Sequence, residues 1–215
     1  MASADTTDAR DALAYLVRQG DDGMLIDCGC GGSVHMILDA TDQIGVPRAG
    51  LGKLVLTHGH IDHIGGANEI RSLTGCDIAA HEGDCRAMET GDAVRTAASM
   101  YGMSLSPISI DEKLSCSKGT ICAGTVEIEW AHTPGHTPGS IVLYLQQPEG
   151  LVVFGQDIHG PFSVAFGSDI GLWRKSMNGI LERGPDILCE GHAGVISGAD
   201  RAAAFIRQQL SMHSG

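Results

Sequence analysis

The sequence predicts an α/β protein in which two sheets are stacked between outer helices. Strand and helix patterns alternate near both ends of the chain, whereas three strand patterns follow one another in the middle. This order suits two sheets with helices outside better than a single doubly wound sheet. The 215 residues are 43% hydrophobic and contain no internal repeat or linker-like tract, so we expect one domain spanning residues 1–215.

The first part of the chain predicts a hairpin that leads into a strand, a helix and a second strand. Short apolar runs at residues 13–17 and 24–26 flank the sequence RQGDDG, which is typical of a hairpin turn. Residues 33–44 carry apolar side chains at helical spacing behind Ser33, a favourable N-cap residue. The apolar run at 53–57 then predicts a strand.

The rest of the chain continues with helices and strands in turn. The remaining predicted elements are helices at 63–73, 82–102, 171–183 and 199–210, and strands at 77–80, 126–130, 140–145, 151–154 and 186–189. In layered α/β proteins, functional sites gather where strands end. Polar residues directly after these strands are therefore the first candidates for a site.

The composition disfavours several classes of partner. The net charge of −12 has the wrong sign for a surface that neutralises phosphates, which disfavours nucleic acids and anionic membranes. No apolar run approaches the roughly 20 residues that span a bilayer, and the N-terminal sequence MASADTTDARDAL lacks the apolar core of a secretory signal. We expect a cytoplasmic protein that acts on a small-molecule substrate, either as a monomer or as a homodimer.

The cysteines predict no disulfide framework. There are seven, an odd number, and they show no repeated C-x-x-C spacing. Cys28 and Cys30 form the only close pair, in CGC. Small residues in a glycine-rich turn explain this pair, and a redox or metal-binding role is the alternative.

The densest group of chemically active side chains is in LTHGHIDHIGG, residues 56–66. It places His58, His60, Asp62 and His63 within six positions, directly after the predicted strand at 53–57. Imidazole nitrogens and carboxylate oxygens are common ligands of zinc and related ions, and a strand end supplies rigid backbone behind them. The motif predicts a metal site at this edge of the sheet.

Three later turns also follow apolar strands and carry the same kinds of side chain. HTPGHTPGS contains His132 and His136, FGQDIHG contains Asp157 and His159, and LCEGHAG contains His192. Each turn alone is weak evidence, because a histidine beside glycine is usually only a polar turn residue. Together with the upstream motif, they predict one metal centre with ligands from several strand ends.

In this order, the motifs LIDCG, THGHIDHIGG, AAHEGD, HTPGHTPGS, FGQDIHG and CEGHAG resemble the metallo-β-lactamase superfamily, and within it the glyoxalase-II-like hydrolases. The resemblance covers most of the chain and implies a four-layer αββα sandwich with a dinuclear metal centre between two sheet edges. It implies that His58, His60 and His136 hold the first ion. Asp62, His63 and His192 would hold the second, and Asp157 would bridge both. Many relatives also have an opening strand. Here that strand is either missing or supplied irregularly by residues 2–10.

The donor set indicates the chemistry. Nitrogen and oxygen ligands without a thiolate fit two divalent ions, with zinc favoured and iron or manganese as alternatives. Because metal binding can bring the pKa of water from about 15.7 to about 7, the expected nucleophile is a hydroxide that bridges the ions. We expect hydrolysis of a thioester, an ester or a lactone, with Asp62, Asp157 and His159 closest to the chemistry. Asp27 in LIDCG is expected to orient a ligand histidine from behind.

Other histidines have weaker assignments. His159 lies two residues beyond Asp157 and either donates a proton to the substrate or forms a structural hydrogen bond. His81 and His132 also lie in family-like contexts. We expect both of them to form hydrogen bonds at strand ends and not to bind metal.

The walls of the substrate pocket have no comparable motif. One candidate wall is the methionine-rich segment 88–105, which would otherwise be core or a dimer contact. Phe162, Phe166 and Trp173, which follow Asp157, are the other candidates. The sequence therefore predicts the metal ligands in more detail than the substrate contacts.

Relatives with other activities define the alternative functions. Glyoxalase II has a C-terminal helical domain that helps to hold glutathione, whereas 23 residues follow His192 here, so thioesters in general are favoured over glutathione thioesters. The known β-lactam-hydrolysing branches lack an aspartate at the position of Asp157, which disfavours antibiotic hydrolysis. A mononuclear iron persulfide dioxygenase is the main alternative. A phosphoesterase and a noncatalytic metal-binding protein follow it.

Overall fold

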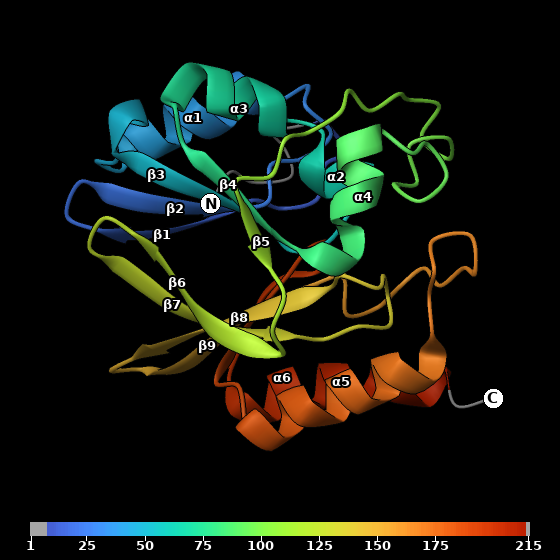
Figure 1. Cartoon of the computed structure of the whole chain (residues 1–215). Helices are drawn as coiled ribbons and strands as arrows, with labels where there is room; N and C mark the ends of the chain where they lie inside the picture. The colour runs from blue at the N-terminus through green and yellow to red at the C-terminus, as the bar shows by residue number, and fades with distance from the viewer. Residues whose placement is uncertain (1–7, 214–215) are drawn as a thin grey trace.

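Two sheets face each other at the centre of the molecule, and helices cover their outer faces (Figure 1). The structure is a computed structural model that describes residues 8–213. Helices α1 (Val34–Gln43) and α3 (Ala67–Thr74) form one outer layer, and helices α5 (Ile170–Arg183) and α6 (Ala199–Met212) form the other. The predicted α/β class and the four-layer αββα sandwich are confirmed.

The first sheet combines one hairpin with parallel strands. Its strands, in spatial order, are β1 (Tyr15–Gln19), β2 (Asp22–Ile26), β3 (Leu51–Leu56), β4 (Asp77–His81) and β5 (Glu112–Leu114). β1 and β2 are antiparallel, whereas β2, β3, β4 and β5 are parallel neighbours. The carboxyl ends of β2 and β3 therefore lie at the same edge, where Asp27 and Thr57 follow them.

The second sheet is antiparallel except between two strands. Its strands, in spatial order, are β11 (Gly194–Ser197), β10 (Ile187–Glu190), β9 (Gly150–Gln156), β8 (Ile141–Gln147), β7 (Val126–His132) and β6 (Lys118–Ala123). β9 and β10 are parallel because α5 carries the chain back between them. Asp157, after β9, and His192, after β10, consequently leave the sheet at the same edge.

The central strand β3 shows how the layers are held together. Leu54 and Leu56 belong to the apolar cluster beneath α1 and α3, whereas Val55, between them, belongs to the cluster between the two sheets. Successive strand residues point to opposite faces, and here both faces are buried. This explains why Leu54, Val55 and Leu56 form an uninterrupted apolar run just before the histidine motif.

The helix predicted at 63–73 is interrupted. It consists of α2 (Ile61–Ile64) and α3, with Gly65 and Gly66 between them. A Cβ atom at Gly65 would overlap the backbone of Cys30, and one at Gly66 would press against the carbonyl of Cys28. The helix is broken where the loop after β2 passes close to its backbone.

The helix predicted at 82–102 was wrong beyond Thr90. Helix α4 spans Glu82–Thr90 and ends at Gly91, which has a left-handed φ of 63°. Asp92 then forms a new turn, because its Oδ1 accepts hydrogen bonds from the backbone nitrogens of Val94 at 3.0 Å and Arg95 at 2.9 Å. Turns and loop occupy the rest of the predicted helix.

Three strands were not predicted, and all three are edge strands. β5 lies at one edge of the first sheet, and β6 and β11 lie at the two edges of the second. β6 buries Ile121 and Ala123 among its six residues, and β11 buries none of its four. An edge strand with so few buried apolar side chains has little hydrophobic pattern for a sequence analysis to detect.

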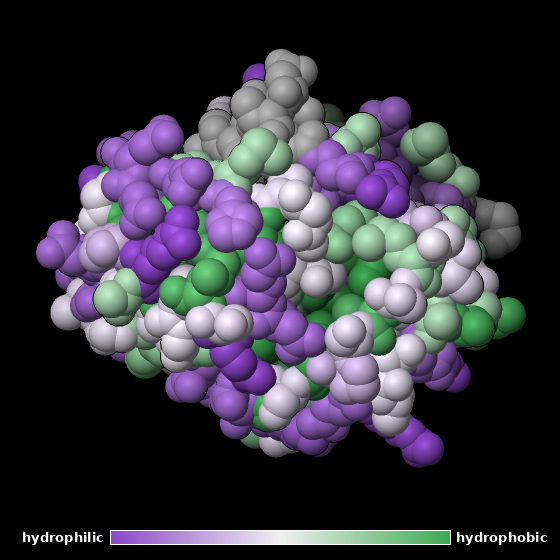
Figure 2. All heavy atoms as spheres, turned by 90° about the horizontal axis from the view of Figure 1, so that it is seen from above, coloured by the Kyte–Doolittle hydropathy of each residue, from purple (hydrophilic) through white to green (hydrophobic). Residues whose placement is uncertain are grey.

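The surface and the ends of the described chain add three facts. Hydrophilic residues are spread over the face seen from above, with hydrophobic residues in smaller areas between them (Figure 2). Among residues 8–213, no helix is long and apolar enough to cross a lipid bilayer. Residues 1–7, most of the segment discussed as an opening strand, lie outside the described residues, and the chain forms a turn at residues 9 and 10.

Candidate metal centre

The two facing sheet edges bring all seven predicted ligands together. The loop after β3 and helix α2 carry four of them. The second sheet supplies His136 from the loop between β7 and β8, Asp157 after β9 and His192 after β10. The donor atoms form two groups, each small enough to hold a metal ion, and Asp157 belongs to both groups.

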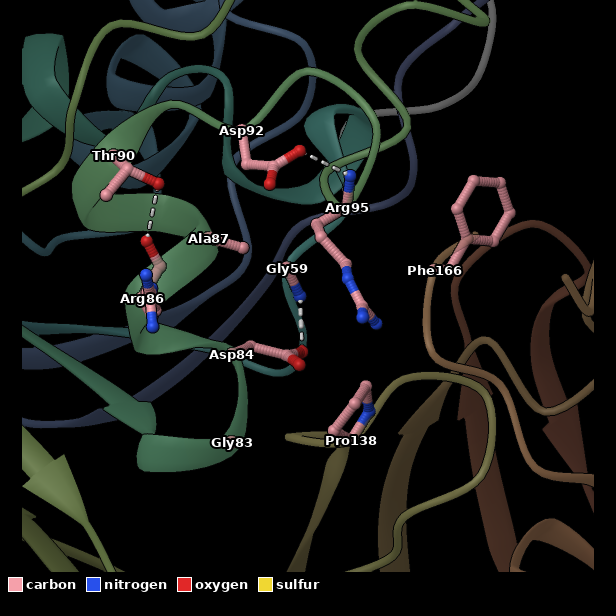
Figure 3. A pocket seen from close by; sticks show the side chains of 10 residues that line it. All are labelled: Gly59, Gly83, Asp84, Arg86, Ala87, Thr90, Asp92, Arg95, Pro138 and Phe166. Carbon is pink, nitrogen blue, oxygen red and sulfur yellow. Dashed lines mark hydrogen bonds between the residues drawn. The ribbon is translucent and has the colours of Figure 1, made fainter. Parts of the chain in front are cut away.

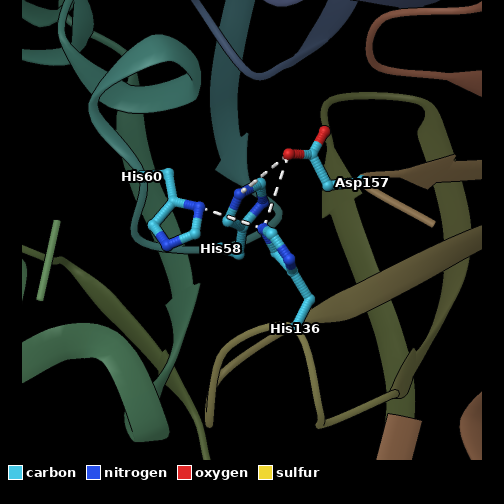
Figure 4. Close-up of side chains that lie close together, drawn as sticks. All are labelled: His58, His60, His136 and Asp157. Carbon is cyan, nitrogen blue, oxygen red and sulfur yellow. Dashed lines mark hydrogen bonds and ion pairs between the residues drawn. The ribbon is translucent and has the colours of Figure 1, made fainter. Parts of the chain in front are cut away.

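The first cluster consists of His58, His60, His136 and Asp157 (Figure 4). Nε2 of His136 lies 2.9 Å from Nδ1 of His60 and 3.4 Å from Oδ2 of Asp157. Nε2 of His58 lies 3.8 Å from the same Asp157 oxygen. The four side chains thus direct one donor atom each toward a common point.

The second cluster consists of Asp62, His63, His192 and Asp157. Nε2 of His63 lies 3.0 Å from Oδ1 of Asp157. Nε2 of His192 lies 3.3 Å from that oxygen and 3.3 Å from Oδ2 of Asp62. Asp157 therefore presents Oδ2 to the first cluster and Oδ1 to the second.

Several polar atoms in these clusters are buried without a partner. Nε2 of His58 has no hydrogen bond within the described chain. Nε2 of His63 and Oδ1 of Asp157 approach each other but do not form a hydrogen bond of acceptable geometry. A buried polar group left unpaired costs about 1–3 kcal/mol, so such a concentration of them indicates a ligand. Nitrogen and oxygen donors fit divalent ions such as zinc, iron or manganese.

The two clusters differ in charge. Burial lowers the pKa of His60 to about 3 and the pKa of His136 to about 4, and it also lowers the pKa of His58. By contrast, contacts with Asp157 and Asp62 raise the pKa of His192 to about 10. The first cluster combines three imidazoles that are neutral at pH 7 with one carboxylate, whereas the second combines two histidines with two carboxylates.

Asp27 lies behind His63, in the position expected of a residue that orients a ligand histidine. Its Oδ2 lies 2.6 Å from Nδ1 of His63. Thr57 donates hydrogen bonds to the same carboxylate from its backbone nitrogen at 2.8 Å and from its hydroxyl at 2.7 Å, and the Gln156 side chain donates a further one. This carboxylate directs Nε2 of His63 toward the second cluster.

The sequence analysis missed Asp84, a fully buried residue of α4 that joins two ligand loops. Its Oδ2 accepts hydrogen bonds from the backbone nitrogen of Gly59 at 2.9 Å and from the Thr137 hydroxyl at 2.5 Å. Its Oδ1 accepts one from the backbone nitrogen of Gly139 at 2.8 Å. Gly59 lies between two ligand histidines, and Thr137 follows His136. The only sequence signal was the motif AAHEGD, which does not reveal contacts 25 to 55 residues away.

His159 forms the structural hydrogen bond that was one of its two alternatives. Its Nδ1 lies 2.6 Å from Oε1 of the buried Glu190, and this contact raises the pKa of His159. The other Glu190 oxygen accepts hydrogen bonds from the backbone nitrogens of His192 at 2.8 Å and Ala193 at 2.7 Å. Glu190, which the sequence analysis also missed, therefore supports both His159 and the loop that carries His192.

His81 and His132 lie outside both clusters, as expected. Their rings stack with centroids 3.8 Å apart. Nδ1 of His81 accepts a hydrogen bond from the backbone nitrogen of Gly83 at 3.2 Å, and Nε2 of His132 lies 2.8 Å from the carbonyl oxygen of Pro138. The pair joins the end of β4 to the end of β7.

A cavity of about 310 Å³ opens over the clusters. Its lining residues are His60, Asp62, Ala97, Met100, Tyr101, Asp157, His159, Gly160, Pro161, Phe166 and His192. Of the candidate wall residues, Met100, Tyr101 and Phe166 line this cavity, whereas Met88 and Trp173 are buried in the core. Segment 88–105 is therefore part wall and part core.

The layered fold and the paired His/Asp clusters define a class of metal-binding α/β sandwich. The family model of the metallo-beta-lactamase superfamily matches residues 7–192, and the chain belongs to this superfamily. Membership and the two clusters together indicate a site that can hold divalent metal ions. The chain spans less than two thirds of the length of the Drosophila relative described next.

Individual relatives are similar at moderate identity. A beta-lactamase-like protein 2 homolog from Drosophila melanogaster is 29% identical over 185 residues, which are 85% of this chain and 58% of that protein. The probable metallo-hydrolase YybB of Bacillus subtilis is 25% identical over 184 residues, 83% of this chain and 79% of that protein. The crystal structure of the metallo-beta-lactamase MIM-1 from Novosphingobium pentaromativorans superposes with a TM-score of 0.76 at 20% identity, over 92% of this chain and 81% of that one. This last likeness shows the fold alone.

Proposed function

We propose that this chain is a dinuclear metal-dependent hydrolase that cleaves a small thioester, ester or lactone. The observation that carries the proposal is the Asp157 carboxylate, which presents Oδ2 to His58 and His136 and Oδ1 to His63 and His192. One carboxylate that faces both clusters suits two ions held close together. Superfamily membership and the metallo-hydrolase name of the Bacillus relative support hydrolysis as the reaction.

The proposed ligands are three side chains for each ion and one shared carboxylate. His58, His60 and His136 would hold the first ion and Asp62, His63 and His192 the second, with Asp157 shared. Bound there, two divalent ions, zinc first and iron or manganese as alternatives, would polarise the scissile carbonyl and make water nucleophilic at neutral pH. The protein's part is to hold the donor atoms in place, which strand ends of both sheets and the carboxylates behind them do.

His159 is proposed to contact the substrate. Glu190 holds its Nδ1, so Nε2 is the ring nitrogen left for a ligand in the cavity that His159 lines. In that position, Nε2 can donate a hydrogen bond to a substrate oxygen. Tyr101 lies near Asp62 in the same wall, where burial and that carboxylate raise the pKa of its hydroxyl, so it remains a protonated donor.

The cavity suits a small acyl substrate. Its volume of about 310 Å³ is at the lower end of the range for small-molecule sites. Met100, Pro161 and Phe166 supply apolar surface for an acyl chain, and the metal ligands lie on the same cavity. The polar groups that would react and the apolar groups that would hold the chain are thus adjacent.

Metal analysis combined with a substrate panel tests the proposal. Protein loaded with zinc, manganese or iron should contain close to two ions per chain and should hydrolyse a thioester, an ester or a lactone. The panel also contains phosphoesters, a β-lactam and glutathione persulfide. One iron per chain, with oxygen consumption on the persulfide and no hydrolysis, would overturn the proposal in favour of a dioxygenase. Turnover of phosphoesters alone would indicate a phosphoesterase, and metal without turnover a noncatalytic protein.

A further inference from the structure

A second cavity, of about 440 Å³, adjoins the metal centre (Figure 3). Phe166 lines both this cavity and the one over the clusters, and its ring lies edge-on to His60 with centroids 4.7 Å apart. Gly59, between the ligand histidines His58 and His60, lines the second cavity as well. Phe166 is therefore a wall common to both cavities.

Two exposed arginines, Arg86 of α4 and Arg95 of the turn after it, line this second cavity. Within residues 8–213, neither side chain forms an ion pair, whereas Arg48, Arg71 and Arg183 each pair with a carboxylate. Together they place two positive charges at one cavity of a chain with a net charge of −12. They make this cavity a place where an anion can be held.

The two carboxylates of the cavity form no ion pair with these arginines. Asp84 accepts three hydrogen bonds from the ligand loops, and burial raises its pKa. Oδ1 of Asp92 accepts hydrogen bonds from the backbone nitrogens of Val94 and Arg95. Neither carboxylate lies within ion-pair distance of a described arginine, so both guanidinium groups keep their donors for a ligand.

Gly167 lies against the end of the Arg95 side chain. A Cβ atom at Gly167, which has a φ of 81°, would overlap Nη1 of Arg95 and press against Pro138. The missing side chain thus lets the guanidinium reach across to the loop that carries Phe166. In Figure 3, the Arg95 side chain extends between Gly59 and Phe166 toward Pro138.

We propose that this second cavity binds an anionic group of the substrate, a carboxylate or a phosphate, through Arg95 and Arg86. The planar fork of a guanidinium matches the oxygens of both groups. This inference rests on the proposed hydrolase function and narrows it, because it makes the substrate an acyl compound with a negative charge remote from the scissile bond.

Anion binding by the metal-loaded protein is the first test, and it does not depend on turnover. The side-chain Nε–Hε resonances of Arg86 and Arg95 should shift saturably with inorganic phosphate or with succinate, and the tighter of the two ligands identifies the group. The resonance of Arg207, on α6 outside the cavity, should not shift. Arg95→Gln should weaken binding about tenfold, in line with the loss of a charge-assisted hydrogen bond, whereas Arg207→Gln should not. Absent shifts, or equal affinity in Arg95→Gln, would overturn the proposal.

Matched substrates supply the second test. The ratio of kcat/KM for a succinyl thioester to that for the uncharged butyryl thioester should fall about tenfold in Arg95→Gln and less in Arg86→Gln. It should be unchanged in Arg207→Gln. A ratio that is the same in all four proteins contradicts the anion cavity. Anion binding at Arg95 without hydrolysis of any acyl substrate would instead contradict the hydrolase proposal. The proposal that this cavity binds an anion would then still hold.

Discussion

The two halves of the metal centre differ in charge, exposure and support. The first cluster holds three buried histidines whose pKa values burial lowers. In the second cluster, Asp62 adds a carboxylate and His192 is exposed. Two further carboxylates support that cluster, Asp27 behind His63 and Glu190 beneath the loop of His192. An enclosed set of three imidazoles and one carboxylate suits tight retention of an ion, whereas a more open set with two carboxylates suits exchange with water and substrate.

Asp157→Ala should have the largest effect, because Asp157 is the one residue that the two clusters share. In the proposed dinuclear site, its loss would leave two cations without a shared carboxylate charge. We expect the variant to retain at most one ion per chain. Its loss of kcat/KM should go well beyond the about 10–100-fold that an outer-shell ligand partner costs. Elemental analysis and kinetics measure the two effects, and circular dichroism verifies the fold. Near-normal turnover would show that the two clusters work independently.

Removal of metal should have the second-largest effect, and the two ions should leave in two separate steps. A ligand at 100 times its Kd stabilises the folded state by about 2.7 kcal/mol, which corresponds to roughly 5–10 °C in the Tm of a protein of this size. A chelator titration should release the ion of the open second cluster first, with loss of activity, and the ion of the first cluster later. Metal content, activity and Tm followed together test this order. Simultaneous release of both ions would remove the distinction between the clusters.

Sequence reasoning predicted the two clusters far better than their surroundings, for a physical reason. The residues of the clusters lie in short motifs that follow apolar strands, so the local pattern indicated a common sheet edge. The resemblance to a known superfamily then divided them into two groups. Asp84 and Glu190 act through contacts with segments distant in the sequence, and such contacts leave no local sequence pattern. The same holds for the fold: β3, buried on both faces, was predicted, whereas the edge strand β11 was not.

Asp27→Asn should affect the second cluster alone. The substitution preserves shape but weakens the hold on Nδ1 of His63, and loss of such a partner costs about 10–100-fold in metal affinity or activity. Metal titration should therefore show weaker binding of the ion at the second cluster and unchanged binding of the ion at the first cluster.

Asp84→Asn is the matched comparison, because Asp84 bonds to the loops of the first cluster. Its amide group would face backbone donors, which leaves at least one of them unpaired. In metal titration, this variant should show weaker binding of the ion at the first cluster. If both variants weaken metal binding at the same cluster, Asp27 and Asp84 do not support separate clusters.

Cys189→Ser should have the smallest effect on activity, and it tests whether the second cluster is made of nitrogen and oxygen donors only. Cys189 immediately precedes Glu190, so a thiolate ligand would belong to this cluster. Its side chain is instead buried among the apolar residues between the sheets, and burial raises its pKa to about 12. We expect metal content to be unchanged and activity within about twofold of the parent protein. The free energy of unfolding should fall by about 1–3 kcal/mol, since serine buries a hydroxyl group there. Loss of an ion in this variant would mean that sulfur contributes to the site.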